Sequence, residues 1–334
     1  MLGYIGRRLL QMIPLLLALT VIIFIIIQLP PGDYVTMYVA RLQMTGTETS
    51  QAEIDRMVNL YHLDKPLYEQ YFIWIRNILL HGDFGVSMQW SKPVSEVIGE
   101  RLLMTMVVSV LTLIFIYAVA VPIGIYSATH QYTWSDYLVT FFGFVGISVP
   151  GFLIALAIIY FVFARTGVAL TGLFSPEFAN APWSLARVGN MLSRIWLPML
   201  VIGLSGTASI IRVTRSMMLD ELQKQYVITA RAKGVPERKL LLKYPVRMAI
   251  NPLVSTMGWL LPYIVSGEAL VSIVLNLPTT GPLLLTALLA QDMHLAGSFL
   301  LITSALTVFG TLLSDILLAW LDPRIRFGGV SEEA

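Results

Sequence analysis

Long runs of apolar residues dominate the chain. Seven stretches contain no Asp, Glu, Lys or Arg: 9–32, 102–135, 137–164, 195–211, 248–267, 269–291 and 293–314. A helix that crosses a bilayer needs about 20 mostly apolar residues, because the hydrocarbon core is about 30 Å thick. The pattern therefore predicts an all-α membrane protein.

The stretch 269–291 is expected to add no span of its own. Glu268 only separates it from the helix before it, and Pro278, Gly281 and Pro282 interrupt its remainder. We expect 277–291 to be an outer-face loop or a re-entrant turn, which is tolerated at membrane depth only where protein buries it. Six transmembrane helices are then predicted.

These spans divide the chain. We expect the N-terminus and first span at 1–29, an external amphipathic segment at 30–100 and a helical core at 101–334. The core is predicted to hold spans at about 102–128, 137–164, 195–219, 248–274 and 297–321, an external loop at 165–194, a cytoplasmic loop at 220–247, an external turn at 275–296 and a cytoplasmic tail at 322–334.

Composition supports lipid as the main solvent. Apolar side chains make up 56% of the 334 residues and charged ones only 13%, against about 25% charged in an average soluble domain. The net charge of +2 gives no sign of nucleic-acid binding, and without cysteine there is no disulfide framework. The run from Leu9 to Leu29 is longer than the apolar region of a signal peptide, so we expect a retained span.

The basic residues predict the direction of the spans. With the N-terminus in the cytoplasm, Arg7, Arg8, nine Lys or Arg between 212 and 247, and Arg324 and Arg326 all fall inside. The short external loop 165–194 holds only three. Basic residues in short loops favour the cytoplasmic side, so we predict that both termini lie inside.

The loop 220–247 stands out because seven Lys or Arg lie between Lys224 and Arg247. Good helix formers precede Gly234, a residue suited to end a helix, and Pro236 and Glu237 suit the first turn of the next helix. A helix, a glycine turn and a second helix are predicted on the cytoplasmic face. Charge alone is equally typical of an ordinary loop that contacts lipid headgroups, but the small residues Thr229, Ala230 and Ala232 favour close approach of another surface.

Five motifs in this chain resemble, in the same order, the permease subunits of ABC importers of the dipeptide and oligopeptide group. They are "YIGRRLLQMIPLLLALTVIIFIIIQLPPGD" at 4–33, "LDKPLYEQYFIWIRNILLHGDFGVS" at 63–87, "YVITARAKG" at 226–234, "GPLL" at 281–284 and "LDPRIRFG" at 321–328. The third is similar to the cytoplasmic EAA loop of that family, although Ile228 stands where other ABC permeases carry a glutamate.

The resemblance implies a division of labour. A second homologous permease subunit, two ATPase subunits that hold ATP and Mg, and an external solute-binding protein would be the partners, in a bacterial or archaeal cytoplasmic membrane. This chain would be non-catalytic and bind no cofactor or metal. Peptides, or a related solute such as oligosaccharides, would cross the membrane through the pathway that the two permease subunits form. The loop residues expected to contact an ATPase are Tyr226, Thr229, Ala230, Arg231, Ala232, Lys233 and Gly234.

Other charged residues within apolar helices are weaker candidates. Glu268 is a candidate for a pathway or gate together with Ser272, where family members often carry the glutamate, and the alternative is a water-exposed carboxylate near the outer interface. For Asp315 we expect a structural ion pair with Arg212 or Arg215 rather than a role in transport.

Two other classes of protein remain as alternatives. An ion-coupled carrier or channel without an ATPase partner would need several paired charges deep in the spans, and a membrane enzyme would need clustered catalytic side chains. The four histidines show no metal-ligand spacing, and the sequence has no G-x-x-x-x-G-K-[ST] phosphate loop, so any ATP hydrolysis would be done by a partner.

Overall fold

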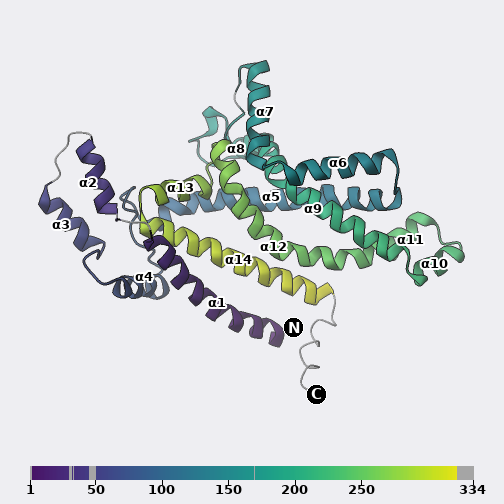
Figure 1. Cartoon of the computed structure of the whole chain (residues 1–334), viewed down its shortest axis with the longest axis horizontal. Coiled ribbons are helices and arrows are strands. Elements are labelled where there is room, and N and C mark those ends of the chain that lie inside the picture. The colour runs from purple at the N-terminus through teal and green to yellow at the C-terminus, as the bar shows by residue number, and fades with distance from the viewer. Residues whose placement is uncertain (1, 30–31, 33, 45–49, 169, 322–334) are drawn as a thin grey trace. The chain divides into compact units, whose positions relative to one another are not determined.

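The computed structural model describes residues 2–29, 32, 34–44, 50–168 and 170–321. These residues are largely helical, and the β-structure within them is one isolated bridge between Val86 and Pro93. The chain forms two compact units (Figure 1). Unit 1 comprises residues 1–8, 105–278 and 309–334, and unit 2 comprises 9–104 and 279–308. Helices α1 (Leu2–Gln28), α5 (Val94–Thr129) and α14 (Met293–Leu321) contribute residues to both.

By length and composition, four of the described helices could each cross a membrane: α1, α5, α9 (Trp196–Leu222) and α14. Two bent pairs bring the total up to six if each pair is one span. One pair is α6 (Trp134–Ser148) with α7 (Gly151–Thr166), and the other lies within α12 (Pro245–Val274).

The predicted span 137–164 is two helices that meet at 103°. The break falls at Val149, whose φ of −95° and ψ of 123° are extended, immediately before Pro150. A proline disfavours the helical conformation of the residue before it and cannot donate an N–H to the preceding turn. The sequence Val149-Pro150 therefore ends α6 and lets α7 begin in a new direction.

Helix α9 is the centre of unit 1. It packs against α6, α7, α8 (Leu185–Arg194) and α12, and eleven of its residues are buried. A Cβ on Gly124 of α5 would lie 2.6 Å from the Thr214 Cβ and 3.0 Å from the Ile211 carbonyl oxygen of α9, so glycine permits the observed approach of these two helices. The short helix η1 (Pro176–Phe178) and α8 form the connection 165–194.

Helix α12 bends by 47° between Gly258 and Tyr263. Pro262 lies in this interval and has no N–H to bond the turn before it, which accounts for the bend. Two neighbouring helices bind carbonyls just before the bend. The Tyr117 hydroxyl of α5 donates to the Leu253 carbonyl over 2.9 Å, and the Ser314 hydroxyl of α14 donates to the Val254 carbonyl over 3.1 Å.

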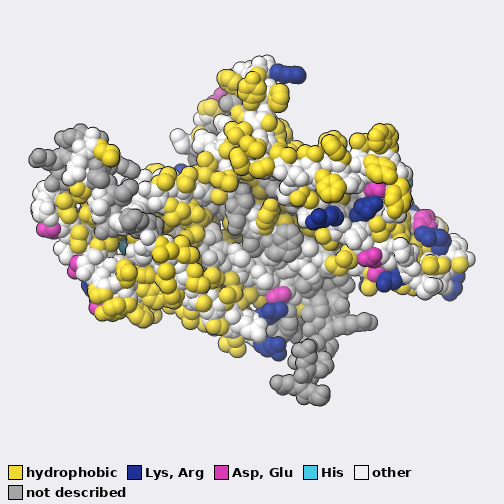
Figure 2. Space-filling model, in the orientation of Figure 1, with side chains coloured by type: hydrophobic (Ala, Val, Ile, Leu, Met, Phe, Trp, Pro, Cys, Tyr) yellow, Lys and Arg dark blue, Asp and Glu magenta, His cyan; other side chains and the backbone are white. Residues whose placement is uncertain are grey.

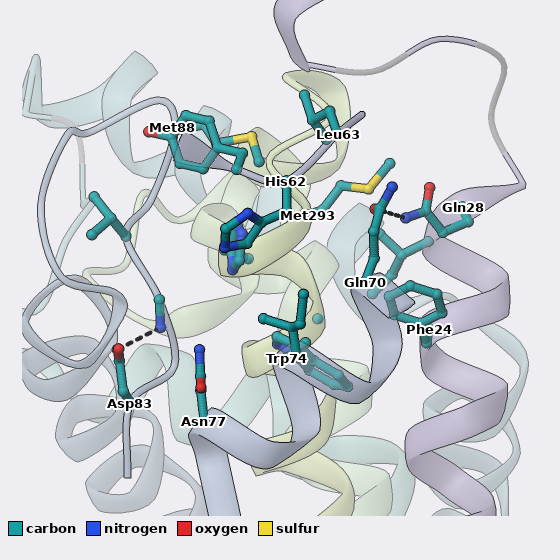
Figure 3. Close-up of a pocket in the computed structure, with 17 residues that line it drawn as sticks. Phe24, Gln28, His62, Leu63, Gln70, Trp74, Asn77, Asp83, Met88 and Met293 are labelled. Carbon is teal, nitrogen blue, oxygen red and sulfur yellow. Dashed lines mark hydrogen bonds between the residues drawn. The ribbon is translucent and has the colours of Figure 1, made fainter. Parts of the chain in front are cut away.

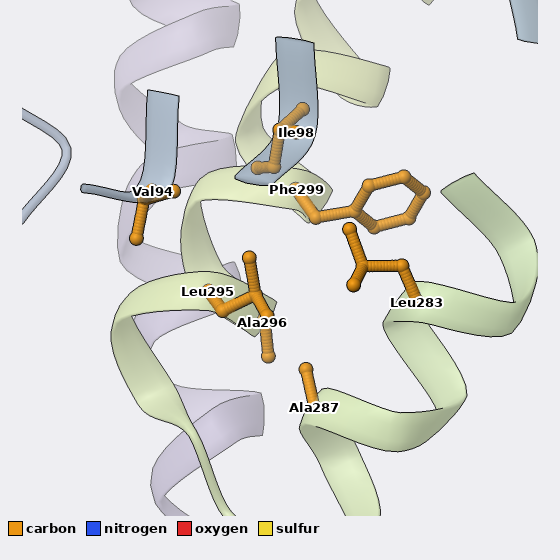
Figure 4. Packing of buried hydrophobic residues seen from close by; sticks show 7 residues of the cluster. All are labelled: Val94, Ile98, Leu283, Ala287, Leu295, Ala296 and Phe299. Atoms are coloured by element: carbon orange, nitrogen blue, oxygen red, sulfur yellow. The ribbon is translucent and has the colours of Figure 1, made fainter. Parts of the chain in front are cut away.

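Unit 2 contains α2 (Tyr34–Met44), α3 (Gln51–Leu60), α4 (Leu67–His81) and α13 (Thr280–Leu289), with parts of α1, α5 and α14. Buried apolar residues of α5, α13 and α14 pack together (Figure 4): Val94, Ile98, Leu283, Ala287, Leu295, Ala296 and Phe299. In the expected turn 277–291, Pro282 falls in the first turn of α13. A proline there removes an N–H that has no helical partner anyway, so it starts a helix instead of preventing one.

A buried carboxylate joins two distant segments of unit 2. Asp292, just before α14, accepts hydrogen bonds from the Ser87 hydroxyl over 2.5 Å and from the Gln89 N–H over 3.0 Å. Its other oxygen accepts the N–H of Leu295 over 3.1 Å and so caps α14. The loop before α5 is thereby fixed to the start of α14.

Candidate functional site

The basic loop is an elbow of two short helices, α10 (Gln225–Ala232) and α11 (Glu237–Lys243). Gly234 has a φ of +74°, a left-handed conformation that side chains other than glycine adopt only with strain. Its N–H bonds the Arg231 carbonyl over 3.0 Å, and the N–H of Val235 bonds the Ala230 carbonyl over 3.3 Å. This pair of bonds is the Schellman ending expected where glycine follows a helix.

The elbow has a small hydrophobic interior. Val227 and Leu240 are completely buried, and Ala230 is 7% exposed between them. Val235, Leu241 and Tyr244 pack against this cluster. These contacts join α10 to α11, so the two helices form one folded piece.

Polar contacts on the surface reinforce the elbow. The Arg231 guanidinium binds Glu237 across the turn, with Nη2 to Oε1 at 2.6 Å and Nε to Oε2 at 3.1 Å. This hydrogen-bonded pair raises the pKa of Arg231 and lowers the pKa of Glu237. The Tyr226 hydroxyl donates to Glu221 near the end of α9, and burial together with this bond raises the pKa of Tyr226 to about 12.

The predicted contact residues divide by burial. Six of the seven are exposed on the elbow: Tyr226, Thr229, Arg231, Ala232, Lys233 and Gly234. Ala230 instead faces Leu240 inside the elbow and supports its shape. Figure 2 shows Lys, Arg, Asp and Glu side chains gathered around α10 and α11, whereas hydrophobic side chains cover α6 and α7.

The elbow continues directly into the helices of unit 1. Met218 of α9, Ala128 of α5 and Ala249 of α12 form a buried cluster next to it, and Leu241 of α11 packs against that cluster. Tyr244, which ends α11, is followed at once by Pro245 of α12. The contacts of the elbow therefore reach both α9 and α12.

One turn closer to the middle of α9, Arg215 binds a buried carboxylate. Its Nη2 lies 2.9 Å from Asp136 Oδ2 and its Nε lies 3.1 Å from Oδ1. Asp136 is 3% exposed and also accepts the Ser127 hydroxyl and, over 3.1 Å, the N–H of Tyr132. The pair ties α9 to the turn between α5 and α6.

The expected pairing of Asp315 with Arg212 or Arg215 is corrected by the structure. Asp315 of α14 pairs with Arg8 of α1, with Nε and Oδ2 3.3 Å apart, and Arg215 is occupied by Asp136. Sequence reasoning missed Asp136. The signal was available, since Thr133-x-x-Asp136 resembles a capping box, and the Thr133 side chain does accept the N–H of Asp136.

The two candidate gate residues lie one turn apart on α12. The side chain of Glu268 is outside the described residues. Ser272 is completely buried, and its carbonyl accepts the N–H of Leu277 over 2.8 Å.

Several helices long and apolar enough to cross a membrane, with a basic elbow between two long helices, are typical of a membrane transport subunit. Comparison with known families identifies which one. Residues 120–327 match the binding-protein-dependent transport system inner membrane component family, and residues 1–109 match the N-terminal domain of such membrane components. The chain belongs to this family.

Relatives match over nearly the full length. The oligopeptide transport system permease protein AppB of Bacillus subtilis is 33% identical over 98% of this chain and 100% of its own. The glutathione transport system permease protein GsiC of Salmonella typhimurium is 32% identical over 98% of this chain and 100% of its own. The predicted resemblance to peptide-group ABC permeases is thus confirmed, and the chain is a membrane permease subunit of a binding-protein-dependent importer.

Proposed function

We propose that this chain forms half of the pathway through which an ATP-driven importer takes up peptides. We also propose that its elbow binds an ATPase subunit and transmits the movement of that subunit to the transmembrane helices. A second homologous permease would complete the pathway, and two partner ATPases would hold ATP and Mg. An external binding protein would deliver the solute. In this arrangement the elbow and both termini face the cytoplasm of a bacterial or archaeal cell, as the distribution of basic residues favours.

The observation that carries the proposal is the preformed elbow. Its interior is closed by Val227, Ala230 and Leu240, so its outer face is free to serve a partner. That face carries small residues around the turn, and nothing lies within 4 Å of a Cβ built on Gly234. A rigid piece with small outer side chains can enter a groove closely and transmit force.

The contacts of the elbow support a mechanical role. Tyr226 holds α10 to Glu221 on α9, and the cluster around Met218 links α11 to α9 and α12. When ATP closes the ATPases, α10 would move and α9 and α12 would follow. Alternating access then results, because the gap between the two permeases opens outward as these helices turn.

Peptide is the substrate class that the relatives favour. One is named for oligopeptide transport and the other for glutathione transport, and glutathione is itself a short peptide. Oligosaccharides are the second substrate class that the resemblance implies. Uptake assays with labelled peptides and oligosaccharides by the complete transporter in vesicles separate these possibilities.

The coupling role is tested by a double substitution, Gly234→Val with Ala232→Glu. Valine strains the left-handed turn and glutamate adds bulk and charge to the outer face. We expect normal membrane insertion but ATP hydrolysis that no longer drives uptake in reconstituted vesicles. Undiminished uptake would refute the coupling role.

A matched control exists in the external loop. Gly167 also has a positive φ, +68°, with nothing within 4 Å of its Cβ position, and Ala186 is exposed on α8. The pair Gly167→Val and Ala186→Glu imposes the same backbone strain and charge away from the elbow, so uptake should continue. Purification in mild detergent adds a second test, because an ion-coupled carrier would not retain an ATPase or a second permease.

A further inference from the structure

Unit 2 contains a cavity of about 210 Å³ that the coupling role does not use. The end of α1, the loops on either side of α4, α4 itself and the start of α14 enclose it (Figure 3). Its walls are mainly apolar and aromatic, with Phe24 and Trp74 rings 6.2 Å apart and Met88 and Met293 nearby. An apolar cavity of roughly 150 Å³ accepts a benzene ring, so this one holds a single side chain with the groups next to it.

A few polar groups with unused bonding capacity also line the cavity. Asp83 accepts the Gly85 N–H over 2.8 Å but makes no ion pair with any described residue. Asn77 lies beside it, since the Asp83 N–H bonds the Asn77 carbonyl over 3.2 Å, and the Asn77 side-chain amide has no hydrogen-bond partner among the described residues. Figure 3 shows Asp83 and Asn77 together, with Phe24 and the hydrogen-bonded Gln28 and Gln70 on the far side of Trp74.

The charge of the lining selects a cation. Asp83 is the one carboxylate among the described lining residues, which include no Lys or Arg. Aromatic faces also attract cations. An ammonium group next to an apolar or aromatic side chain fits these walls, in which His62, His294 and the Trp74 indole N–H supply polar contacts beside the one carboxylate.

A shallow groove of about 590 Å³ adjoins the cavity. The two share His62, Ile73 and Asn77 as lining residues, and the charged residues that the groove adds are two cations, Lys65 and Arg76, and one carboxylate, Glu69. Arg76 and Asn77 are consecutive on α4 and both line the groove, so a cationic residue borders the wall that the groove shares with the cavity. An extended dipeptide spans about 7 Å, so its two ends can lie one in the cavity and the other in the adjoining groove.

We infer that unit 2 binds the amino-terminal residue of a short peptide in the cavity, with its ammonium at Asp83 and its carboxylate end at Lys65 and Arg76. The inference rests on the proposed peptide specificity and adds a site for the substrate outside the helices that the elbow drives. The neutral side-chain amides that line the cavity suit the peptide group between the ammonium and the carboxylate of such a peptide, because each amide can both donate and accept a hydrogen bond. Phosphatidylethanolamine also carries an ammonium, but its phosphate would have to lie where the cavity offers no cation.

The test is equilibrium binding of radiolabelled Phe-Ala to the full chain in phosphatidylcholine nanodiscs. N-acetyl-Phe-Ala lacks the ammonium and Phe-Ala-amide lacks the carboxylate. We expect saturable binding of Phe-Ala, about tenfold weaker binding after Asp83→Asn, and weak binding of the acetylated peptide to either protein, since one charge-assisted hydrogen bond carries roughly this factor. Arg76→Gln should weaken Phe-Ala binding and leave Phe-Ala-amide unaffected.

The variants are chosen to keep the fold. Asparagine at position 83 retains an oxygen for the Gly85 N–H and removes only the charge. Asp64→Asn is the matched control, because Asp64 is exposed in the turn before α4 and lines neither the cavity nor the groove, and binding should be unchanged. Equal binding of free and acetylated peptide, no effect of Asp83→Asn, or displacement of the peptide by phosphatidylethanolamine would each overturn the inference.

Failure of this site is distinguishable from failure of the proposed function. If the complete transporter imports peptides while the chain shows no saturable binding, only the site is refuted. If neither binding nor peptide uptake occurs, the peptide specificity itself is refuted.

Discussion

Replacing Asp136 by asparagine should destabilise unit 1 by about 2–3 kcal/mol. The carboxylate is 3% exposed and accepts two hydrogen bonds from Arg215, one from Ser127 and one from the N–H of Tyr132. Asparagine retains one acceptor oxygen but leaves the guanidinium without a counter-charge. Because the Arg215 side chain is 29% exposed, water compensates part of this loss, and the cost stays below the 3–5 kcal/mol typical of a fully buried pair that is broken.

The reverse change should cost more. Arg215→Met leaves Asp136 charged, and the Asp136 side chain is only 4% exposed, so little water can replace the guanidinium. We expect a loss of about 3–5 kcal/mol. The double variant should cost less than the sum of the two single variants, by about 2 kcal/mol, because neither charge is then left alone in the interior.

The free energy of unfolding is measured by SDS titration of the purified protein in mixed micelles, followed by tryptophan fluorescence. Glu96→Gln is the control. Glu96 pairs with Lys92 at 2.8 Å, but both side chains are more than half exposed, so no measurable change is expected. Equal costs for the two single variants, or strict additivity in the double variant, would show that the pair is not buried as described.

Three further outcomes are expected. Gly234→Ala should lower stability by about 1 kcal/mol, because its Cβ meets open space and only the φ of +74° is strained; a neutral result in thermal unfolding would contradict the left-handed turn. Asp292→Ala should cost roughly 2–4 kcal/mol and make the loop near Ser87 sensitive to limited proteolysis, since three buried donors lose their acceptor; unchanged cleavage would exclude this role. For Tyr226, a pKa raised to about 12 means that its bond to Glu221 contributes stability below the ordinary value of 10.0 and loses it as pH rises through about 12. The stability lost in Tyr226→Phe should therefore be the same near pH 7 and about pH 9, and a cost that disappears by about pH 9 would contradict the bond.

The local features of the chain were the more predictable ones. In "YVITARAKGVPE", helix propensity, a glycine that ends a helix and a proline that starts one are enough to place a helix, a left-handed glycine and a second helix. Each of these features depends only on neighbours in sequence. The break at Pro150 and the helix start at Pro282 depend on the same local chemistry, but we expected one unbroken span at 137–164 and an interruption at Pro282, and the structure corrects both expectations.

Contacts between distant segments were less accessible. Asp315 pairs with Arg8, from the opposite end of the chain, and charge spacing within one helix carries no information about which other helix will face it. The lining of the cavity in unit 2 comes from α1, α4, two loops and α14, so no single stretch of sequence marks it. The burial of Ala230 likewise depends on Leu240, which reaches it only after the chain has turned at Gly234.

A partner-binding segment that already holds its own shape changes how a multi-subunit machine is put together. The elbow satisfies its helix end and closes its interior using its own residues, so a partner that binds it has little disorder to remove. In the proposed transporter, an ATPase subunit would therefore bind a surface that is already folded. Little of the binding energy between the elbow and that subunit would be used to fold the elbow, so most of it would remain available to move the helices attached to the elbow.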